Sequence, residues 1–248
     1  PNVDGHIIFP DNSILMRTGL QVNPDGAAAS YVPGDHGYTY ISNGVNLRDN
    51  GKKISCSATP ENGSRCRKEW ARAEAGGFGP GTSEFCVFAM EVEPFSPGTS
   101  KSACEGSHYR YIVGNGKGRP KAGQQIPVVG GGAVTSYLST TTLTHTEQGK
   151  VVYVDSGSIP GLVVPRSHVG LVGSLAWVRY GNREVFAIVN DTGPAFGEAS
   201  VALHQFLRSG QIGPIQAVGP IPLNLRCSAT EADLKPPFLS KPDFGEND

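Results

Sequence analysis

The chain has 248 residues, with 22 acidic and 21 basic side chains and a formal net charge of −1. This balance gives no electrostatic sign of nucleic acid or an anionic membrane surface as a partner. No stretch approaches the roughly 20 apolar residues of a membrane span. Thirty-three Gly, nineteen Pro and only 17% charged residues favour short strands and turns. We therefore expect a mainly β (α+β) protein that buries a substantial core. The length suits one large domain or two small ones, and we assign a single domain over residues 1–248.

The first half of the chain predicts short strands, followed by a segment that carries most of the cysteines. Residues 1–50 hold strand-like runs, such as 6–9, between turn clusters. Residues 51–125 are rich in Gly, Ser and Pro, and we interpret them as a loop-rich insertion. Within the insertion we expect one short helix around 67–75 and strand-like runs at 85–92 and 109–113.

The spacing of the five cysteines favours disulfides over a metal site. Cys56, Cys66, Cys86 and Cys104 cluster in the insertion, whereas Cys227 stands near the C-terminus. No Cys-x-x-Cys pair exists and no His lies at zinc-ligand spacing, so we expect no metal and no cofactor. At least one disulfide within the cluster would suit an exported protein, extracellular or periplasmic. Five reduced thiols in a cytosolic protein remain the alternative.

The densest β pattern lies between residues 126 and 225. Residues 175–180 and 184–189 flank Gly181-Asn182 and predict a hairpin with a two-residue turn. A tail from residue 228 onward is expected to form an extended wrap or to be partly disordered.

The end of this hairpin leads into a pair of carboxylates. The apolar run 185–189 predicts a fully buried strand that stops at Asn190-Asp191. Apolar residues at helical spacing follow Glu198, which we expect in the first turn of a helix ending at Ser209-Gly210. Two carboxylates on rigid supports around a gap are what glycoside hydrolysis requires. The alternative interpretation is that Asp191 is a loop residue without a catalytic role and that Glu198 is a charge at the helix N-terminus, stabilised by the helix dipole.

The segment around this pair also resembles a known family. VNDTGPAFGEASVAL (189–203) resembles the signature of glycoside hydrolase family 75, the endo-chitosanases. QVNPDGAAASYVPGDHGYTYISNG (21–44), VVYVDSGSIPGLVVPRS (151–167) and GSLAWVRYGNREVFAIVNDTGP (173–194) are similar to other blocks of that family, in the same order. The loop between the carboxylates looks shorter than in the fungal enzymes, and residues 55–119 match nothing in the family.

This resemblance implies a secreted, monomeric endo-glycosidase that hydrolyses β-1,4 bonds in an amino-sugar polysaccharide, chitosan first, with Asp191 and Glu198 as catalytic pair. It implies inversion, for which the carboxyls stand about 6.5–9.5 Å apart. The order of elements is also similar to the double-psi β-barrels of peptidoglycan lytic transglycosylases, so we expect a double-psi-like β-barrel core. A peptidoglycan glycan-strand hydrolase, a non-catalytic carbohydrate-binding barrel and a secreted structural domain remain alternatives.

The roles within the pair follow from the neighbours of each carboxylate. Glu198 lies near apolar Phe196 and Ala199, so we assign it as the general acid; Asp191, beside Asn190 and Thr192, is assigned as the general base. The reverse assignment stays open, since a helix N-terminus favours an ionised Glu.

Four further residues are candidates for binding the polysaccharide: Asp155, Asp25, Asp35 and Thr192. Asp155 precedes Ser156-Gly157, and the other two aspartates precede or flank glycines. Simple turn chemistry is therefore the alternative for all three aspartates.

Overall fold

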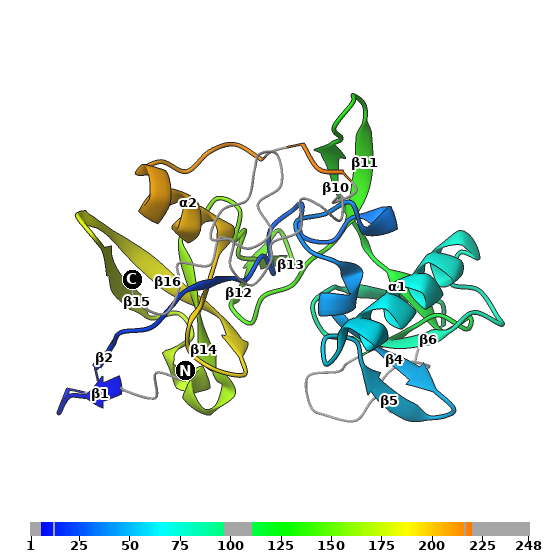
Figure 1. Cartoon of the computed structure of the whole chain (residues 1–248), viewed down its shortest axis with the longest axis horizontal. Helices are drawn as coiled ribbons and strands as arrows, with labels where there is room; N and C mark the ends of the chain where they lie inside the picture. Colours follow the sequence, from blue (N-terminus) through cyan, green and yellow to red (C-terminus); the bar gives the residue numbers. More distant parts are fainter. Residues whose placement is uncertain (1–5, 12, 97–110, 216, 220–248) are drawn as a thin grey trace. The chain divides into compact units, whose positions relative to one another are not determined.

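A computed structural model describes residues 6–11, 13–96, 111–215 and 217–219 (Figure 1). Its contacts divide the chain into two compact units. Unit 1 is built from Pro1–Pro24 and Thr142–Pro214, and unit 2 is built around Asp25–Thr141. The predicted tail from residue 228, as well as Cys104 and Cys227, lies outside the described residues.

Unit 1 carries the segment with the two carboxylates. Its elements are β1 (His6–Ile8), β2 (Ile14–Met16), β3 (Gln21–Val22), β12 (Thr144–Glu147), β13 (Lys150–Tyr153), β14 (Gly161–Pro165), the 3-10 segment η3 (Arg166–Leu171), β15 (Leu175–Tyr180), β16 (Arg183–Gly193), β17 (Glu198–Ala199) and α2 (Val201–Ser209).

Five of these strands form one mixed sheet in the order β15-β16-β14-β17-β3. The pairs β14–β16 and β17–β3 are parallel, whereas β15–β16 and β14–β17 are antiparallel. Helix α2, orange in Figure 1, packs its apolar side against one face of this sheet. Leu203 and Leu207 of the helix meet Ala187 and Ala199 of the sheet, and all four are buried.

The predicted β15–β16 hairpin is confirmed, with Tyr180 opposite Arg183 across the two-residue turn. Two expectations nearby are wrong. Strand β16 continues to Gly193 instead of stopping before Asp191, because it goes on pairing with β14. The strand is not buried throughout, since Phe186 is 70% exposed on the face away from α2.

The start of α2 is a further correction. Glu198 lies on strand β17, and the helix begins at Val201. Ser200 is the N-cap, because its hydroxyl accepts a hydrogen bond from the Leu203 amide. Glu198 therefore precedes the helix and lies outside its first turn.

Unit 2 contains the cysteine-bearing segment. Its elements are the 3-10 segments η1 (Pro33–Asp35) and η2 (Ile41–Asn43), β4 (Val45–Asp49), β5 (Lys52–Ser55), α1 (Pro60–Ala75), β6 (Glu84–Val87), β7 (Val92–Pro94), β8 (Tyr111–Val113), β9 (Gly118–Pro120), β10 (Ala122–Pro127) and β11 (Ala133–Tyr137).

The predicted helix of this unit is longer than expected. It starts at Pro60, because the Thr59 side chain accepts from the Asn62 amide and Pro60 suits the first helical position. Cys56, just after β5, forms a disulfide with Cys66 of α1. Cys86 is disulfide-bonded as well.

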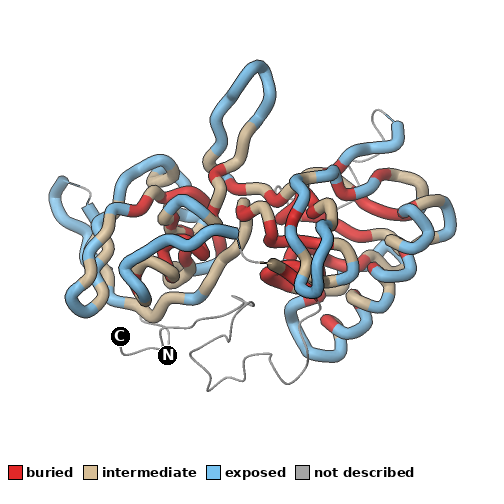
Figure 2. Tube along the Cα trace, turned by 90° about the horizontal axis from the view of Figure 1, so that it is seen from above, coloured by how far each residue is buried: buried red, intermediate tan, exposed pale blue. Residues whose placement is uncertain are grey.

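The core of unit 2 centres on Trp70 of α1. Its ring makes edge-on contacts with Phe78, Phe85 and Tyr137, at centroid distances of 5.0 to 6.1 Å. Figure 2 shows buried stretches in both units with exposed loops around them. Within the described ranges the strands form sheets of two to five strands and only two α-helices occur, so the protein is mainly β, as predicted.

Candidate functional site

The register of three strands brings the two carboxylates opposite one residue. Val163 of β14 pairs with Asp191 of β16 on one side and with Glu198 of β17 on the other. Paired residues of adjacent strands direct their side chains to the same face of a sheet. Two strand spacings separate the Cα atoms of Asp191 and Glu198 by about 10 Å. Both carboxylates therefore stand on one face, one on each side of Val163.

A β-bulge at Asn190 determines this face. Leu162 pairs with Val189, but Val163 pairs with Asp191, so Asn190 is an extra residue on β16. The alternation of the strand is thereby shifted by one residue. Leu162 packs on the side of α2, so Val163 and its partner Asp191 point to the opposite side. The bulge thus moves the Asp191 side chain off the helix-covered face.

Gly161 leaves room for the bulge. A Cβ atom at this position would come within 2.5 Å of Asn190 Oδ1, so a side chain cannot be accommodated there. The Asn190 amide instead donates to the Ser156 hydroxyl, and its backbone carbonyl accepts from Leu143. These contacts hold the residue beside Asp191 in a buried position.

One oxygen of Asp191 receives three hydrogen bonds. Oδ1 accepts from the Thr142 amide at 3.0 Å, the Thr142 hydroxyl at 2.7 Å and the Thr192 amide at 2.8 Å. The hydroxyls of Thr142 and Thr192 lie 3.0 Å apart. No described residue donates to Oδ2. Burial raises the pKa of Asp191 above its usual value, and these donors partly oppose the rise.

Glu198 is held by a residue from the N-terminal part of unit 1. The Asn23 side-chain amide, directly after β3, donates to Oε2 at 2.9 Å. Gly193 gives space to the same carboxylate, since a Cβ there would lie 3.3 Å from Oε2. Burial raises the pKa of Glu198, and the negative charge of Asp191 raises it further.

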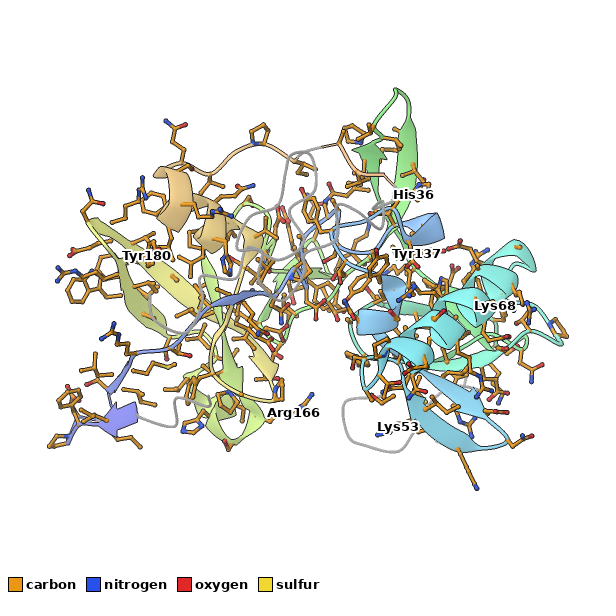
Figure 3. The ribbon with its side chains drawn as sticks, viewed as in Figure 1. His36, Lys53, Lys68, Tyr137, Arg166 and Tyr180 are labelled. Atoms are coloured by element: carbon orange, nitrogen blue, oxygen red, sulfur yellow. A yellow bond between two sulfur atoms is a disulfide. The ribbon has the colours of Figure 1, made fainter. Side chains whose placement is uncertain are left out.

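Arg166 is the cation whose charge reaches both carboxylates. It follows β14 directly, at the start of η3, and is labelled in Figure 3. Its positive charge lowers the pKa of Asp191 and of Glu198, in each case less than burial raises it. The Arg166 side chain is exposed. The arrangement is thus a pair of partly desolvated carboxyls beside one solvated guanidinium.

The structure brings together three of the six predicted site residues: Asp191, Glu198 and Thr192. Asp155 belongs to the same unit, but both of its carboxylate oxygens accept hydrogen bonds within its own turn, from the Gly157 amide and the Ser158 hydroxyl. This is the geometry of the alternative turn interpretation.

Asp25 and Asp35 belong to unit 2. Asp25 accepts a hydrogen bond from the Tyr31 hydroxyl at 2.7 Å. Asp35 accepts from the Ile41 amide at 2.7 Å and has a positive φ of 59°, a conformation that Asp tolerates better than most residues. Both carboxylates therefore make local contacts within their unit.

Sequence reasoning missed Thr142, Asn23 and Arg166. Thr142 ends a run of three threonines that carries no chemical signal. Asn23 and Arg166 do lie inside the blocks 21–44 and 151–167 that resemble the family, so those blocks were the available signal.

The described ranges contain no group of three or more His, Cys, Asp or Glu side chains that could hold a metal ion. No helix within them is long and apolar enough to cross a membrane. In comparisons with known proteins, no protein-family model and no curated protein matches the chain.

Proposed function

We propose that this protein is an endo-glycosidase that hydrolyses β-1,4 bonds of an amino-sugar polysaccharide with Asp191 and Glu198. One observation carries the proposal: two carboxyls, on the strands to either side of β14, flank Val163 on one face, and burial raises the pKa of both. Glycoside hydrolysis uses such a pair, one carboxyl protonated and one ionised, in a fixed geometry. A raised pKa keeps a carboxyl protonated at a pH closer to that at which an enzyme works.

Glu198 fits the general acid better than Asp191. Its carboxylate has one amide donor, whereas Asp191 accepts three hydrogen bonds that favour its ionised form. The charge of Asp191 also keeps the proton on Glu198. The objection from the helix dipole no longer applies, because Glu198 precedes the N-cap of α2.

The proposed step is a single displacement. The oxygen of a water molecule bonds to the anomeric carbon while Asp191 accepts a proton from that water. The bond from that carbon to the glycosidic oxygen breaks, and Glu198 gives its proton to the departing oxygen. The Cα atoms of the two residues stand about two strand spacings apart, which is compatible with the carboxyl separation that inversion requires.

Chitosan is the first candidate substrate. Five residues of the site fall in blocks that resemble the endo-chitosanases of family 75: Asn23, Arg166, Asp191, Thr192 and Glu198. The disulfide between Cys56 and Cys66 supports export of the protein from the cytosol, and such polymers are found outside the cytosol. The double-psi-like barrel is part of the same proposal, supported by the two parallel pairs of the mixed sheet.

Peptidoglycan is the second candidate, and Arg166 favours it. A guanidinium close enough to lower the pKa of both carboxyls repels the ammonium groups of chitosan. N-acetylated glycan strands carry no such positive charge, so Arg166 does not oppose their binding.

The test replaces each carboxyl by its amide. Asp191→Asn and Glu198→Gln should fold normally and lose about 10²- to 10⁴-fold in turnover, the usual contribution of a general acid or base. Glu147→Gln is the control, because Glu147 is an exposed carboxylate on strand β12 of the same unit. Products from chitosan and from purified peptidoglycan are resolved by mass, which identifies the substrate.

Near-normal turnover in either amide variant would remove that residue from the mechanism. Binding of polysaccharide without any cleavage by the wild-type protein would instead favour the non-catalytic carbohydrate-binding alternative.

A further inference from the structure

The β15–β16 hairpin exposes three large apolar side chains that no site described above uses. Leu175 and Trp177 of β15 are 73% and 61% exposed, and Phe186 of β16 is 70% exposed. Trp177 and Phe186 are direct cross-strand partners. We call the two aromatic residues the aromatic strip, and Leu175 flanks it. An apolar surface of this kind on a folded protein commonly marks a binding site.

The aromatic strip lies on the same sheet face as the two carboxylates. Val178, Val185 and Ala187 of the hairpin pack toward α2, so their sequence neighbours Trp177 and Phe186 point to the opposite face. A regular strand would place Phe186 and Asp191, five residues apart, on opposite faces. The bulge at Asn190 adds one residue and brings them to the same face.

The distance between strip and carboxylates suits a polymer. Four or five residue steps of about 3.3 Å separate Phe186 from Asp191 along β16, a span of about 13–17 Å. Phe186 and Asp191 stand on the same strand, β16, which fixes their separation. A chain of several sugar units bound at the carboxylates and running along β16 therefore passes over the two rings.

The chemistry of the strip matches a sugar chain. Pyranose rings have apolar C–H faces, which pack on flat aromatic rings, and hydroxyl groups at their edges. Arg179 and Glu184 point to the same face beside the rings, with nitrogen and oxygen 3.8 Å apart and most of the Arg179 side chain exposed. They offer donors and acceptors for those hydroxyls.

We infer that the aromatic strip is a second glycan-binding surface, which holds sugar units of the polysaccharide several residues from the bond cleaved at Asp191 and Glu198. The inference rests on the proposed function. Its occupant is a glycan chain because two rings, a polar pair and the carboxylates share one face of the mixed sheet, on which Glu184, Phe186 and Asp191 follow one another along β16. A purely aliphatic partner would leave the polar pair and the continuity with the carboxylates unused.

The test compares Trp177→Ala, Phe186→Ala and Phe186→Leu with Phe95→Ala. Phe95 is an exposed aromatic residue of unit 2, so its replacement controls for a general loss of aromatic surface. Phe186→Leu keeps an apolar side chain but removes the ring. Titration calorimetry measures binding of four ligands: soluble chitosan polymer, a chitosan disaccharide, soluble peptidoglycan glycan strands and a peptidoglycan disaccharide. KM and kcat are measured alongside.

Each Ala variant should bind the polymer about tenfold more weakly, which corresponds to about 1.4 kcal/mol. Disaccharide binding and kcat should stay unchanged, because a short ligand at the carboxylates does not reach the strip. Phe186→Leu should behave like Phe186→Ala, and Phe95→Ala like the wild type.

The failures of the two proposals are distinguishable. Cleavage with unchanged polymer KM in all strip variants would overturn the strip and leave the proposed function standing. Polymer binding that depends on the rings, without any cleavage, would keep the strip and overturn hydrolysis. A fall in self-association of the Ala variants, measured by sedimentation, with unchanged glycan binding would identify the strip as an interface between copies and overturn the inference.

Discussion

At the residue scale, the behaviour of the candidate site depends on how each carboxylate is surrounded. Asp191 is buried and accepts three hydrogen bonds at a single oxygen, two of them from Thr142. Glu198 has one amide donor and feels the charge of its neighbour. These differences favour an ionised Asp191 and a protonated Glu198, as the proposed mechanism requires.

Thr142→Val tests the role of the hydroxyl donor. The valine has a similar shape but cannot donate to Oδ1, so the ionised form of Asp191 loses a hydrogen bond and its pKa rises further. A base must be ionised to act, so the acidic limb of the kcat/KM profile should move to higher pH. Thr142→Ser keeps the hydroxyl and should leave the profile in place. An unchanged profile in the valine variant would separate Thr142 from the chemistry.

Glu198→Gln should stabilise the fold at neutral pH. The pKa of Glu198 is raised in the folded protein above the ordinary value of 4.5. The folded state therefore binds this proton more tightly, and stability falls as pH rises through the interval between the two values. Gln resembles the protonated form, so its melting temperature should exceed that of the wild type at pH 7. The difference in melting temperature should vanish below pH 4.5, the ordinary pKa of a Glu side chain.

Melting temperatures between about pH 3.5 and 8 check this expectation, with Glu147→Gln as the control at an exposed carboxylate of β12 in the same unit. A gap between Glu198→Gln and the wild type that persists unchanged at low pH would contradict it.

At the element scale, the junction between β17 and α2 positions Glu198. The Ser200 hydroxyl accepts from the amides of Leu203 and Gly161 and donates to the carbonyl of Ile159. One buried side chain thus joins the helix start to the segment that enters β14. The strand bearing Glu198 and the strand bearing Val163 are held together at this point.

Ser200→Ala should lower the free energy of unfolding by about 1–3 kcal/mol, because it removes the helix cap and leaves buried amides without an acceptor. Urea unfolding followed by circular dichroism measures the loss. Ser209→Ala, at the exposed end of the same helix, should change stability by less than about 0.5 kcal/mol. Equal losses in the two variants would mean that Ser200 holds the junction no better than a surface residue.

At the scale of the whole molecule, the chain consists of two compact units with separate cores. Each unit contains one of the two tryptophans. Trp70 in unit 2 is 3% exposed, whereas Trp177 in unit 1 is 61% exposed. Unfolding changes the surroundings of Trp70 far more, so tryptophan fluorescence should report mainly on unit 2.

Removal of the Cys56–Cys66 disulfide should destabilise unit 2. The bond closes a loop with a sequence separation of 10, for which chain entropy predicts a loss of about 3 kcal/mol. Cys56→Ala with Cys66→Ala, in a Trp177→Phe background, should unfold at lower urea when followed by fluorescence. Intact mass after alkylation without reduction should find at most one of the five cysteines free, since Cys56 and Cys66 bond to each other and the disulfide of Cys86 requires a fourth cysteine.

An unfolding midpoint that is unchanged by the double replacement would contradict a stabilising role for the bond. Alkylation of all five cysteines in protein purified without reductant would contradict the disulfides themselves, and with them the support for export.

The sequence by itself determined the elements that depend on near neighbours. The two-residue turn predicted the β15–β16 hairpin, the helical spacing predicted α2 to within three residues of its start, and clustered cysteines predicted the disulfide. The nearness of Asp191 and Glu198 also followed from one short motif.

The tertiary structure alone decided the surroundings of those carboxylates. Thr142 and Asn23, which hold them, lie 49 and 175 residues away along the chain from Asp191 and Glu198. The bulge at Asn190 arises from pairing with β14, and it places the Asp191 side chain on the sheet face that carries the aromatic strip. Periodicity and turn propensity act over a few residues, whereas desolvation, hydrogen-bond partners and the face of a side chain depend on segments that meet only after folding.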